Sequence, residues 1–281
     1  MTRTNRRNFL KQSSLAAAGS LLLPTMGFKM APPEKYGIQL YTFRDEMAKD
    51  AQGTLEQIAA IGIKKIESAR SKKGLYYGLS PKEMKNTCER LGMKLCSGHV
   101  ALDKNFEVTM QQAVESGQEY VICSSLPNKG QDIDNYKKVA EAFNKAGKSC
   151  KKLGLKFGYH NHEYEFESDK GEVLYDVLMD NTDPELVHME LDLGWVIIAK
   201  KDPLHYFKKY PKRFPLWHLK DMDMHKKIST EFGKGSLDIP SMMAHKAESG
   251  VEHIFIEQEE YASTAMLSMK YNMNFLKAHS L

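Results

Sequence analysis

The chain has 281 residues, 42% of them hydrophobic, which is enough to bury one large core. Its formal net charge of +4 arises within residues 1–30, which hold five basic residues and no acidic one. The other 35 basic residues are balanced by 36 acidic residues. This balance argues against the basic face that a nucleic-acid-binding protein needs, so we expect no nucleic-acid partner.

The first 30 residues are predicted to be an export signal. Arg6 and Arg7 form a twin arginine, followed by "NFLK" and the mildly apolar "SSLAAAGSLLLP". A basic front and a short apolar middle are typical of bacterial export signals. The paired arginines are typical of signals of the twin-arginine type. The apolar stretch is too short and mixed to span a membrane. We therefore expect residues 1–30 to direct residues 31–281, a single domain, to the periplasm without a stable membrane anchor. The alternative is a poorly ordered N-terminus of a cytoplasmic enzyme.

From residue 35 onward, short apolar runs alternate with amphipathic helical stretches. The runs cover residues 36–42, 63–68, 93–99, 120–125, 155–161, 186–192, 214–220 and 253–259. Strict alternation of strand and helix predicts a parallel sheet. Eight such units in a chain of this length predict a (β/α)8 barrel, which typically takes about 250 residues. An open doubly wound sheet is the rival, but no G-x-G-x-x-G motif follows the first run.

Polar residues lie at or near the ends of four successive apolar runs. The fifth run leads to His160 and His162, the sixth ends at Asp192, the seventh holds His218, and the eighth holds Glu257. In a (β/α)8 barrel these strand ends meet at the rim that carries the active site. Imidazole and carboxylate groups converging from neighbouring strands are a ligand set for a divalent metal, which can act as a Lewis acid. The alternative is a polar rim that only caps the barrel.

Several motifs carry a family resemblance. "ELDLGW", "HLKD", "GKGSLDIP" and "FIEQEE", in that order after "GYHNHEYEF", resemble the sugar phosphate isomerase/epimerase family of xylose isomerase-like barrels. The resemblance runs from Tyr36 to the C-terminus. It implies a xylose isomerase-like TIM barrel and a divalent ion, Mn2+ first, with Mg2+, Co2+ or Zn2+ as alternatives. It also suggests a homodimer.

The resemblance assigns the metal ligands with one departure. The family holds its ion with Glu, Asp, His and Glu, and Asp192, His218 and Glu257 match the last three. His160 stands where many relatives have Glu, and His162, on the same face of the strand, is the second candidate for that place. The predicted metal set is therefore His160, Asp192, His218 and Glu257.

The departure bears on the predicted chemistry. In the epimerases, two glutamates move a proton on opposite faces of a carbon beside a metal-polarised carbonyl. Here Glu257 remains, and His160 or His162 would serve as the other acid–base group. Because sugar phosphates are scarce outside the cytoplasm, we expect a metal-dependent isomerase or epimerase acting on an unphosphorylated carbohydrate. A lyase or dehydratase on a keto-sugar or 3-keto-glycoside begins with the same proton abstraction and is the alternative.

Other rim residues are expected to face the substrate. They are Glu67, His99, Trp195 and Lys220. For Lys220 the alternative is a salt bridge to Asp221 or Glu190, and for Trp195 it is a cover over the barrel mouth. Two readings of another class stay open: a non-catalytic sugar-binding barrel and a protein like the abasic-site endonucleases, which would need a basic groove.

Overall fold

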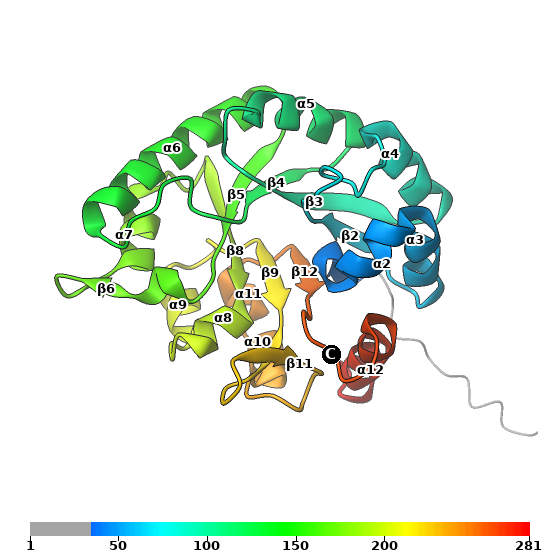
Figure 1. The fold of residues 1–281 in the computed structure, drawn as a ribbon. Coiled ribbons are helices and arrows are strands. Elements are labelled where there is room, and N and C mark those ends of the chain that lie inside the picture. Colours follow the sequence, from blue (N-terminus) through cyan, green and yellow to red (C-terminus); the bar gives the residue numbers. More distant parts are fainter. Residues whose placement is uncertain (1–34) are drawn as a thin grey trace, which may run out of the picture. The chain divides into compact units, whose positions relative to one another are not determined.

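The computed structural model describes residues 35–281 (Figure 1). The predicted signal segment, residues 1–30, lies outside the described residues, so the export signal and the division at residue 31 stay predictions. Parallel strands form a closed barrel in the order β1-β12-β9-β8-β5-β4-β3-β2. Their bounds are β1 Gly37–Gln39, β2 Lys65–Ser68, β3 Lys94–Val100, β4 Tyr120–Cys123, β5 Lys156–His160, β8 Val187–Asp192, β9 Leu216–Leu219 and β12 His253–Ile256. Each predicted run overlaps one of these strands, so the predicted (β/α)8 barrel is confirmed.

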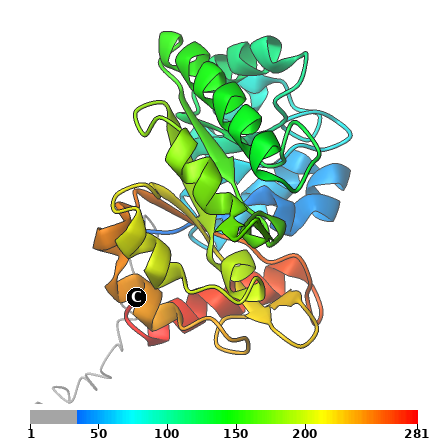
Figure 2. The same ribbon diagram turned by 90° about the vertical axis from the view of Figure 1, so that its left-hand side faces the viewer.

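Helices surround the strands (Figures 1 and 2). They are α2 Arg44–Lys49, α3 Ala51–Ala60, α4 Pro81–Arg90, α5 Phe106–Ser116, α6 Ile133–Lys152, α7 Leu174–Asn181, α8 Leu193–Ile198, α9 Pro203–Lys209, α10 Ile239–Ala244, α11 Lys246–Ser249 and α12 Ala265–Ala278. Two 3-10 turns, η1 Leu40–Phe43 and η2 Tyr164–Phe166, and two hairpins, β6 Ser168–Asp169 with β7 Glu172–Val173 and β10 Asp221–Asp223 with β11 Ile228–Thr230, extend from the barrel. Among residues 35–281, no helix has the length and apolarity needed to cross a membrane.

Local sequence explains where these helices begin and end. At the start of α4, the Ser80 hydroxyl accepts a hydrogen bond from the Glu83 backbone N–H, and the Glu83 carboxylate accepts one from the Ser80 N–H. Pro81 occupies the first helical position, where a missing N–H costs nothing. Gly92 follows the helix with φ of 64°, a left-handed conformation that glycine adopts without strain.

The strands bring polar side chains to one level inside the barrel. Residues alternate across a strand, so Glu190 and Asp192 of β8 share a face. Asp192 is in register with His218 on β9, and Gln39 of β1 is in register with Glu67 on β2. All these residues except Gln39 belong to the clusters of ionisable groups described below. The barrel therefore carries a buried ionisable layer towards the carboxyl ends of its strands.

Candidate active site

A cavity of about 240 Å³ opens at the carboxyl ends of the strands. It is lined by Tyr41, Ala69, Arg70, His99, Ser124, His160, His162, Trp195, Lys220, Glu257 and Glu259. This lining includes six of the side chains that the sequence predicted for the site. The other three predicted residues, Glu67, Asp192 and His218, are fully buried and are not among the lining residues.

The predicted ligands come together in what we call the upper set: His160, Asp192, His218 and Glu257. One ligand atom from each lies within 4.8 Å of the others. His160 Nε2 is 3.3 Å from Asp192 Oδ2, and His218 Nδ1 is 3.0 Å from Glu257 Oε2. The four residues come from or directly follow four neighbouring strands, β5, β8, β9 and β12. Two imidazoles and two carboxylates at this spacing match the mixed N/O donors of a divalent metal.

His162 is not a member of this set, although its ring lies edge-on to that of His160 with centroids 4.9 Å apart. Its ring stacks on Tyr164, with centroids 5.5 Å apart, and it lies 6.0 Å from the ring of Trp195. It lines the cavity, and its Nδ1 atom is buried with no hydrogen-bond partner. The strand β5 ends at His160, so the chain has left the barrel wall before it reaches His162. Of the two candidate histidines, the structure thus brings only His160 together with Asp192, His218 and Glu257.

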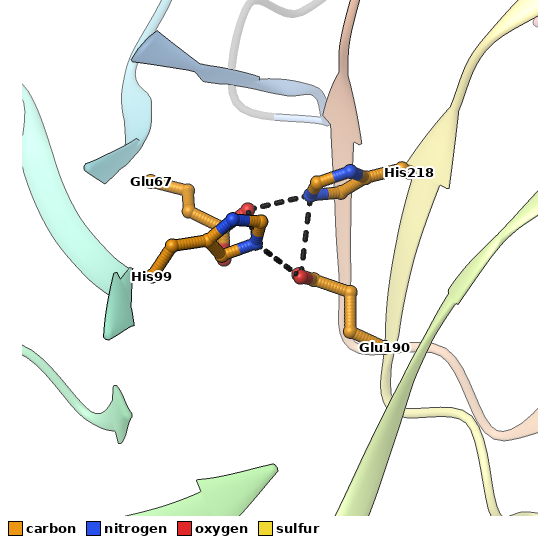
Figure 3. A group of neighbouring side chains, drawn as sticks. All are labelled: Glu67, His99, Glu190 and His218. Atoms are coloured by element: carbon orange, nitrogen blue, oxygen red, sulfur yellow. Dashed lines mark hydrogen bonds and ion pairs between the residues drawn. The ribbon is translucent and has the colours of Figure 1, made fainter. Parts of the chain in front are cut away.

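A second group, the lower set, contains Glu67, His99, Glu190 and His218 (Figure 3). His218 Nε2 lies 2.6 Å from Glu67 Oε1 and 3.3 Å from Glu190 Oε2. His99 Nε2 lies 2.9 Å from Glu190 Oε2. Figure 3 shows the four side chains pointing toward one another from β2, β3, β8 and β9. The two glutamates and His218 are completely buried.

The positions of some lower-set residues differ from those that the sequence predicts. Glu67 was expected to face the substrate, but its carboxylate is enclosed by Gln39, Ser97 and His218. The sequence indicated Glu190 only as an alternative partner of Lys220, although its spacing from Asp192 placed it on the same face of the strand. That period-two spacing was the signal that could have identified it. His99 both belongs to the lower set and lines the cavity, as expected for a residue near the substrate.

Lys220 is the fully buried cation of the site. Its Nζ atom lies 2.7 Å from Glu257 Oε2, 2.7 Å from Glu259 Oε1 and 3.1 Å from Asp192 Oδ2. Its predicted alternative partners were other carboxylates, Asp221 and Glu190. Asp221 instead accepts hydrogen bonds from backbone N–H groups in the loop that contains "GKG". Glu259, which the sequence analysis did not assign to the site, therefore completes the carboxylate shell of Lys220.

The electrostatics keep the carboxylates of the upper set ionised. Burial alone would raise the pKa of Asp192, but Lys220 and His160 hold it well below its usual range. Burial likewise opposes ionisation of Glu257, and Lys220 and His218 outweigh it, so the pKa of Glu257 is lowered. Burial, together with the neighbouring His218, lowers the pKa of His160 to about 4. A neutral imidazole beside two carboxylates leaves lone pairs available for a cation.

The two carboxylates of the lower set have pKa values that are shifted in opposite directions. Burial and the neighbouring Glu190 raise the pKa of Glu67 to about 7. Burial would also raise the pKa of Glu190, but His218 and His99 hold it well below its usual range. Burial opposes the charged form of His218, and Glu190 and Glu257 overcome it, so the pKa of His218 is well above its usual value. His218 therefore faces acceptors with both ring nitrogens.

The donor chemistry of the upper set fits a divalent ion. The set supplies two oxygen and two nitrogen donors, borders the cavity and leaves the Nδ1 atom of buried His160 without a partner. Sites of this kind need an open position for substrate, which the cavity provides. In the lower set, Glu67 and Glu190 are fully buried and lie beside Nε2, the second ring nitrogen of His218. Partners of this type orient a ligating histidine in metalloproteins.

Comparisons with known proteins find similar sequences and similar folds. Over 89 residues the chain is 35% identical to inosose dehydratase 2 of Bacillus cereus, a match that covers 32% of this chain and only 29% of that protein. A sugar phosphate isomerase/epimerase from Parabacteroides distasonis ATCC 8503 superposes with a TM-score of 0.76 and 26% identity, over 88% of this chain and 94% of the other. The IOLI protein, with a zinc atom bound, superposes with a TM-score of 0.68 and 13% identity, over 88% and 98% of the two chains.

The family model described as the xylose isomerase-like TIM barrel matches residues 55–279. That match takes in seven of the barrel strands, β2 to β12, and every residue of the upper and lower sets. The chain belongs to the xylose isomerase-like TIM barrel family.

Proposed function

We propose that the protein is a divalent-metal-dependent isomerase or epimerase that acts on an unphosphorylated carbohydrate. One observation carries the proposal: the four side chains of the upper set converge from neighbouring strands beside a cavity of small-molecule size. The sugar phosphate isomerase/epimerase from Parabacteroides distasonis, which is similar over most of both chains, supports this class of reaction.

Metal binding and proton transfer would be carried out by different residues. His160, Asp192, His218 and Glu257 would hold the ion. When bound, a divalent ion polarises a carbonyl oxygen and so acidifies the neighbouring C–H bond. His162 lines the cavity outside the upper set, and burial together with His160 lowers its pKa to about 3, so its imidazole is neutral near pH 7. His162 would accept the carbon-bound proton because it lines the cavity. Its lowered pKa makes it a weak base, so this step would depend on the acidification of the C–H bond by the ion. Glu257, whose pKa is lowered by Lys220 and His218, is a weaker base still.

The metal is proposed to be Mn2+, with Zn2+, Co2+ and Mg2+ as alternatives. Two imidazoles and two carboxylates suit Mn2+, Co2+ and Zn2+ better than Mg2+, which prefers oxygen ligands and water. The zinc atom in the structurally similar IOLI protein supports an ion within this fold. Metal analysis of the purified protein by mass spectrometry decides among them.

The cavity suits a substrate without phosphate. Its lining contains two permanent cations, Arg70 and Lys220, and it also contains two carboxylates, Glu257 and Glu259. Phosphate sites usually combine several cations or backbone N–H groups. Export by the twin-arginine signal to the periplasm, where free sugars and glycosides are available, is part of the same proposal, as is a homodimer that binds no nucleic acid.

A lyase or dehydratase acting on a keto-sugar or 3-keto-glycoside is the second candidate. It is favoured by the match to inosose dehydratase 2, although that match spans less than a third of the relative's length. A lyase needs one base and a leaving group, while an epimerase needs proton transfer on both faces of the carbon. The product therefore separates the two.

Hydrogen–deuterium exchange tests the shared first step. The protein with Mn2+ is incubated in D2O with a panel of free sugars, ketoses and 3-keto-glycosides, and deuterium at carbon is followed by NMR. We expect exchange, with an isomer, epimer or eliminated product, which EDTA abolishes and Mn2+ restores. His162→Gln should remove the exchange while metal still binds. Tight sugar binding without exchange from any substrate would instead identify a non-catalytic sugar-binding barrel.

A further inference from the structure

The Lys220 ammonium contacts the same carboxylate oxygens that lie beside the histidines of the upper set. The oxygen of Asp192 that lies 3.1 Å from the Lys220 ammonium is Oδ2, and the same atom is 3.3 Å from His160 Nε2. The oxygen of Glu257 that lies 2.7 Å from the ammonium is Oε2, and the same atom is 3.0 Å from His218 Nδ1. The ammonium thus forms ion pairs with the two carboxylate oxygens of the upper set that lie beside His160 and His218.

A divalent ion in the upper set would be held by the same two carboxylates, and Oδ2 of Asp192 and Oε2 of Glu257 are the oxygens that lie beside the two histidines of the set. An ammonium cannot donate hydrogen bonds to the same lone pairs at full strength while a metal accepts them. Two cations sharing one pair of buried carboxylates would also repel each other strongly, because charge interactions are weakly screened in the interior. Binding of a divalent ion to these carboxylates and ion pairing with the Lys220 ammonium therefore exclude each other at least in part.

The surroundings allow the ammonium to move while the Lys220 backbone stays fixed. A Cβ atom at Gly194 would lie 2.8 Å from the Lys220 carbonyl oxygen and 3.0 Å from its Cγ atom, so the base of the side chain is tightly packed. The outer end is different. Lys220 lines the cavity, and its third partner, Glu259, is a cavity residue with a quarter of its side chain exposed. The ammonium also lies 5.0 Å from the Trp195 ring.

We propose that the Lys220 ammonium is a built-in, exchangeable cation. In the metal-free protein it neutralises Asp192 and Glu257, and when a divalent ion enters the upper set it turns into the cavity and keeps only Glu259. Metal binding would then place an ammonium donor beside the substrate, where it can hold a substrate oxygen. The proposal rests on the metal site of the proposed function but does not depend on which reaction occurs there.

Amine labelling of the wild-type protein tests the movement directly. Metal-free protein and protein saturated with Mn2+ or Zn2+ are reductively methylated with formaldehyde and cyanoborohydride, and each lysine is quantified by peptide mass spectrometry. Lys148, which is exposed on α6, serves as the internal reference. We expect Lys220 to be protected without metal and to react at least about tenfold faster with it, while Lys148 is unchanged. Equal protection of Lys220 at metal saturation would overturn the proposal.

Two substitutions test the competition by calorimetric metal titration. Lys220→Met keeps the aliphatic stem and removes the competing cation, so it should tighten metal binding at least about tenfold. Lys234→Met is the matched control, because Lys234 also pairs with a carboxylate, at 3.4 Å, and lies over an aromatic ring. It should leave the affinity unchanged. If Lys220→Met is unstable without metal, labelling of the wild type still decides the question.

Glu259 separates displacement from simple charge repulsion. If Glu259 acts as the resting partner of the displaced ammonium, Glu259→Gln should weaken metal binding in the wild type and have no effect in Lys220→Met, a coupling that a double-mutant cycle measures. An equal effect in both backgrounds would mean that Glu259 acts directly on the metal and would overturn the proposal.

Metal titration of the wild type and of Lys220→Met distinguishes failure of the Lys220 proposal from failure of the proposed metal-dependent function. Metal binding by Lys220→Met but not by the wild type would support the competition and contradict a metal-dependent function for the native protein. Failure of both proteins to bind metal would overturn the two proposals together.

Discussion

The Nε2 atom of His218 lies 2.6 Å from Oε1 of Glu67, which is 151 residues away in the chain. The opposite ring nitrogen, Nδ1, faces Glu257 at 3.0 Å. One imidazole therefore joins the lower set to the upper set. Because the pKa of His218 is raised well above its usual value, both ring nitrogens carry protons in the metal-free protein. A bound ion would replace the proton on Nδ1, while Glu67 keeps the hydrogen bond from Nε2.

Glu67→Gln should weaken metal binding without removing a ligand. The amide keeps the shape of the side chain but is a poorer acceptor for the Nε2 proton, so it holds the ring less firmly. Loss of such an outer partner typically lowers metal affinity about 10- to 100-fold, and isothermal titration calorimetry measures it. Glu56→Gln, which removes a carboxylate that pairs with Arg90, is the control. Unchanged affinity in Glu67→Gln would show that the lower set does not support His218.

Asp192→Asn should abolish metal binding while leaving the fold intact. Asp192 caps α8, because its Oδ1 accepts a hydrogen bond from the Trp195 backbone N–H at 2.9 Å. Asn caps helices about as well as Asp, so the cap survives while the ligand charge is lost. Asp202→Asn makes the same change at the cap of α9, away from the cavity. We expect a loss of affinity of more than about 100-fold in the first variant and none in the second; circular dichroism checks the fold of both.

Metal removal should lower the melting temperature. A ligand at 100 times its Kd stabilises the folded state by about 2.7 kcal/mol, provided that it does not bind the unfolded chain. For a domain of this size, that corresponds to a shift of about 5–10 °C. Differential scanning fluorimetry with EDTA and with Mn2+ measures it. Asp192→Asn should show no such shift, and a shift of equal size in that variant would place the ion elsewhere.

The sequence predicted the upper set because its information is local. Each ligand lies at or near the end of an apolar run, and parallel strands bring such ends together. The lower set depends on something else: Glu67 and His218 meet across the barrel interior, and no local pattern specifies which inward side chains touch. The pairing of Lys220 with Asp192, Glu257 and Glu259 was missed for the same reason. Period two also could not separate His160 from His162, since the spacing continues beyond His160, where the strand ends.

Substitutions at these two histidines should have separate effects. His160→Gln removes a donor 3.3 Å from Asp192, so metal affinity should fall by at least about tenfold. His162→Gln lies outside the upper set, so metal affinity should stay within about twofold while proton exchange into the substrate falls about 100-fold or more. Calorimetry and deuterium exchange measure the two quantities in the same preparations. The reverse result would make His162 the ligand and His160 the base.

Glu165 should make stability depend on pH. Its carboxylate is fully buried and accepts hydrogen bonds from the Tyr159 hydroxyl and, at 2.8 Å, from the His162 backbone N–H. Burial raises its pKa to about 7, above the 4.5 of an exposed glutamate. The folded state thus binds the proton more tightly than the unfolded state. The resulting stabilisation is complete below about pH 4.5 and is lost as the pH rises through 7, a change of about 3 kcal/mol.

Glu165→Gln should remove this part of the pH dependence, because the amide stays neutral. Its oxygen can accept the hydrogen bond from the His162 N–H, while its NH2 group can donate to the Tyr159 oxygen, which reverses that hydrogen bond. Urea unfolding of metal-free protein at pH 5 and pH 8 gives the free energy of unfolding at each pH. Other groups titrate in this range, so the informative quantity is the difference between the variant and the wild type. Glu163→Gln, at an exposed position two residues away, is the control and should follow the wild type. If Glu165→Gln also follows the wild type, Glu165 is ionised in the folded protein, and the buried layer beside His162 carries one more negative charge than we infer.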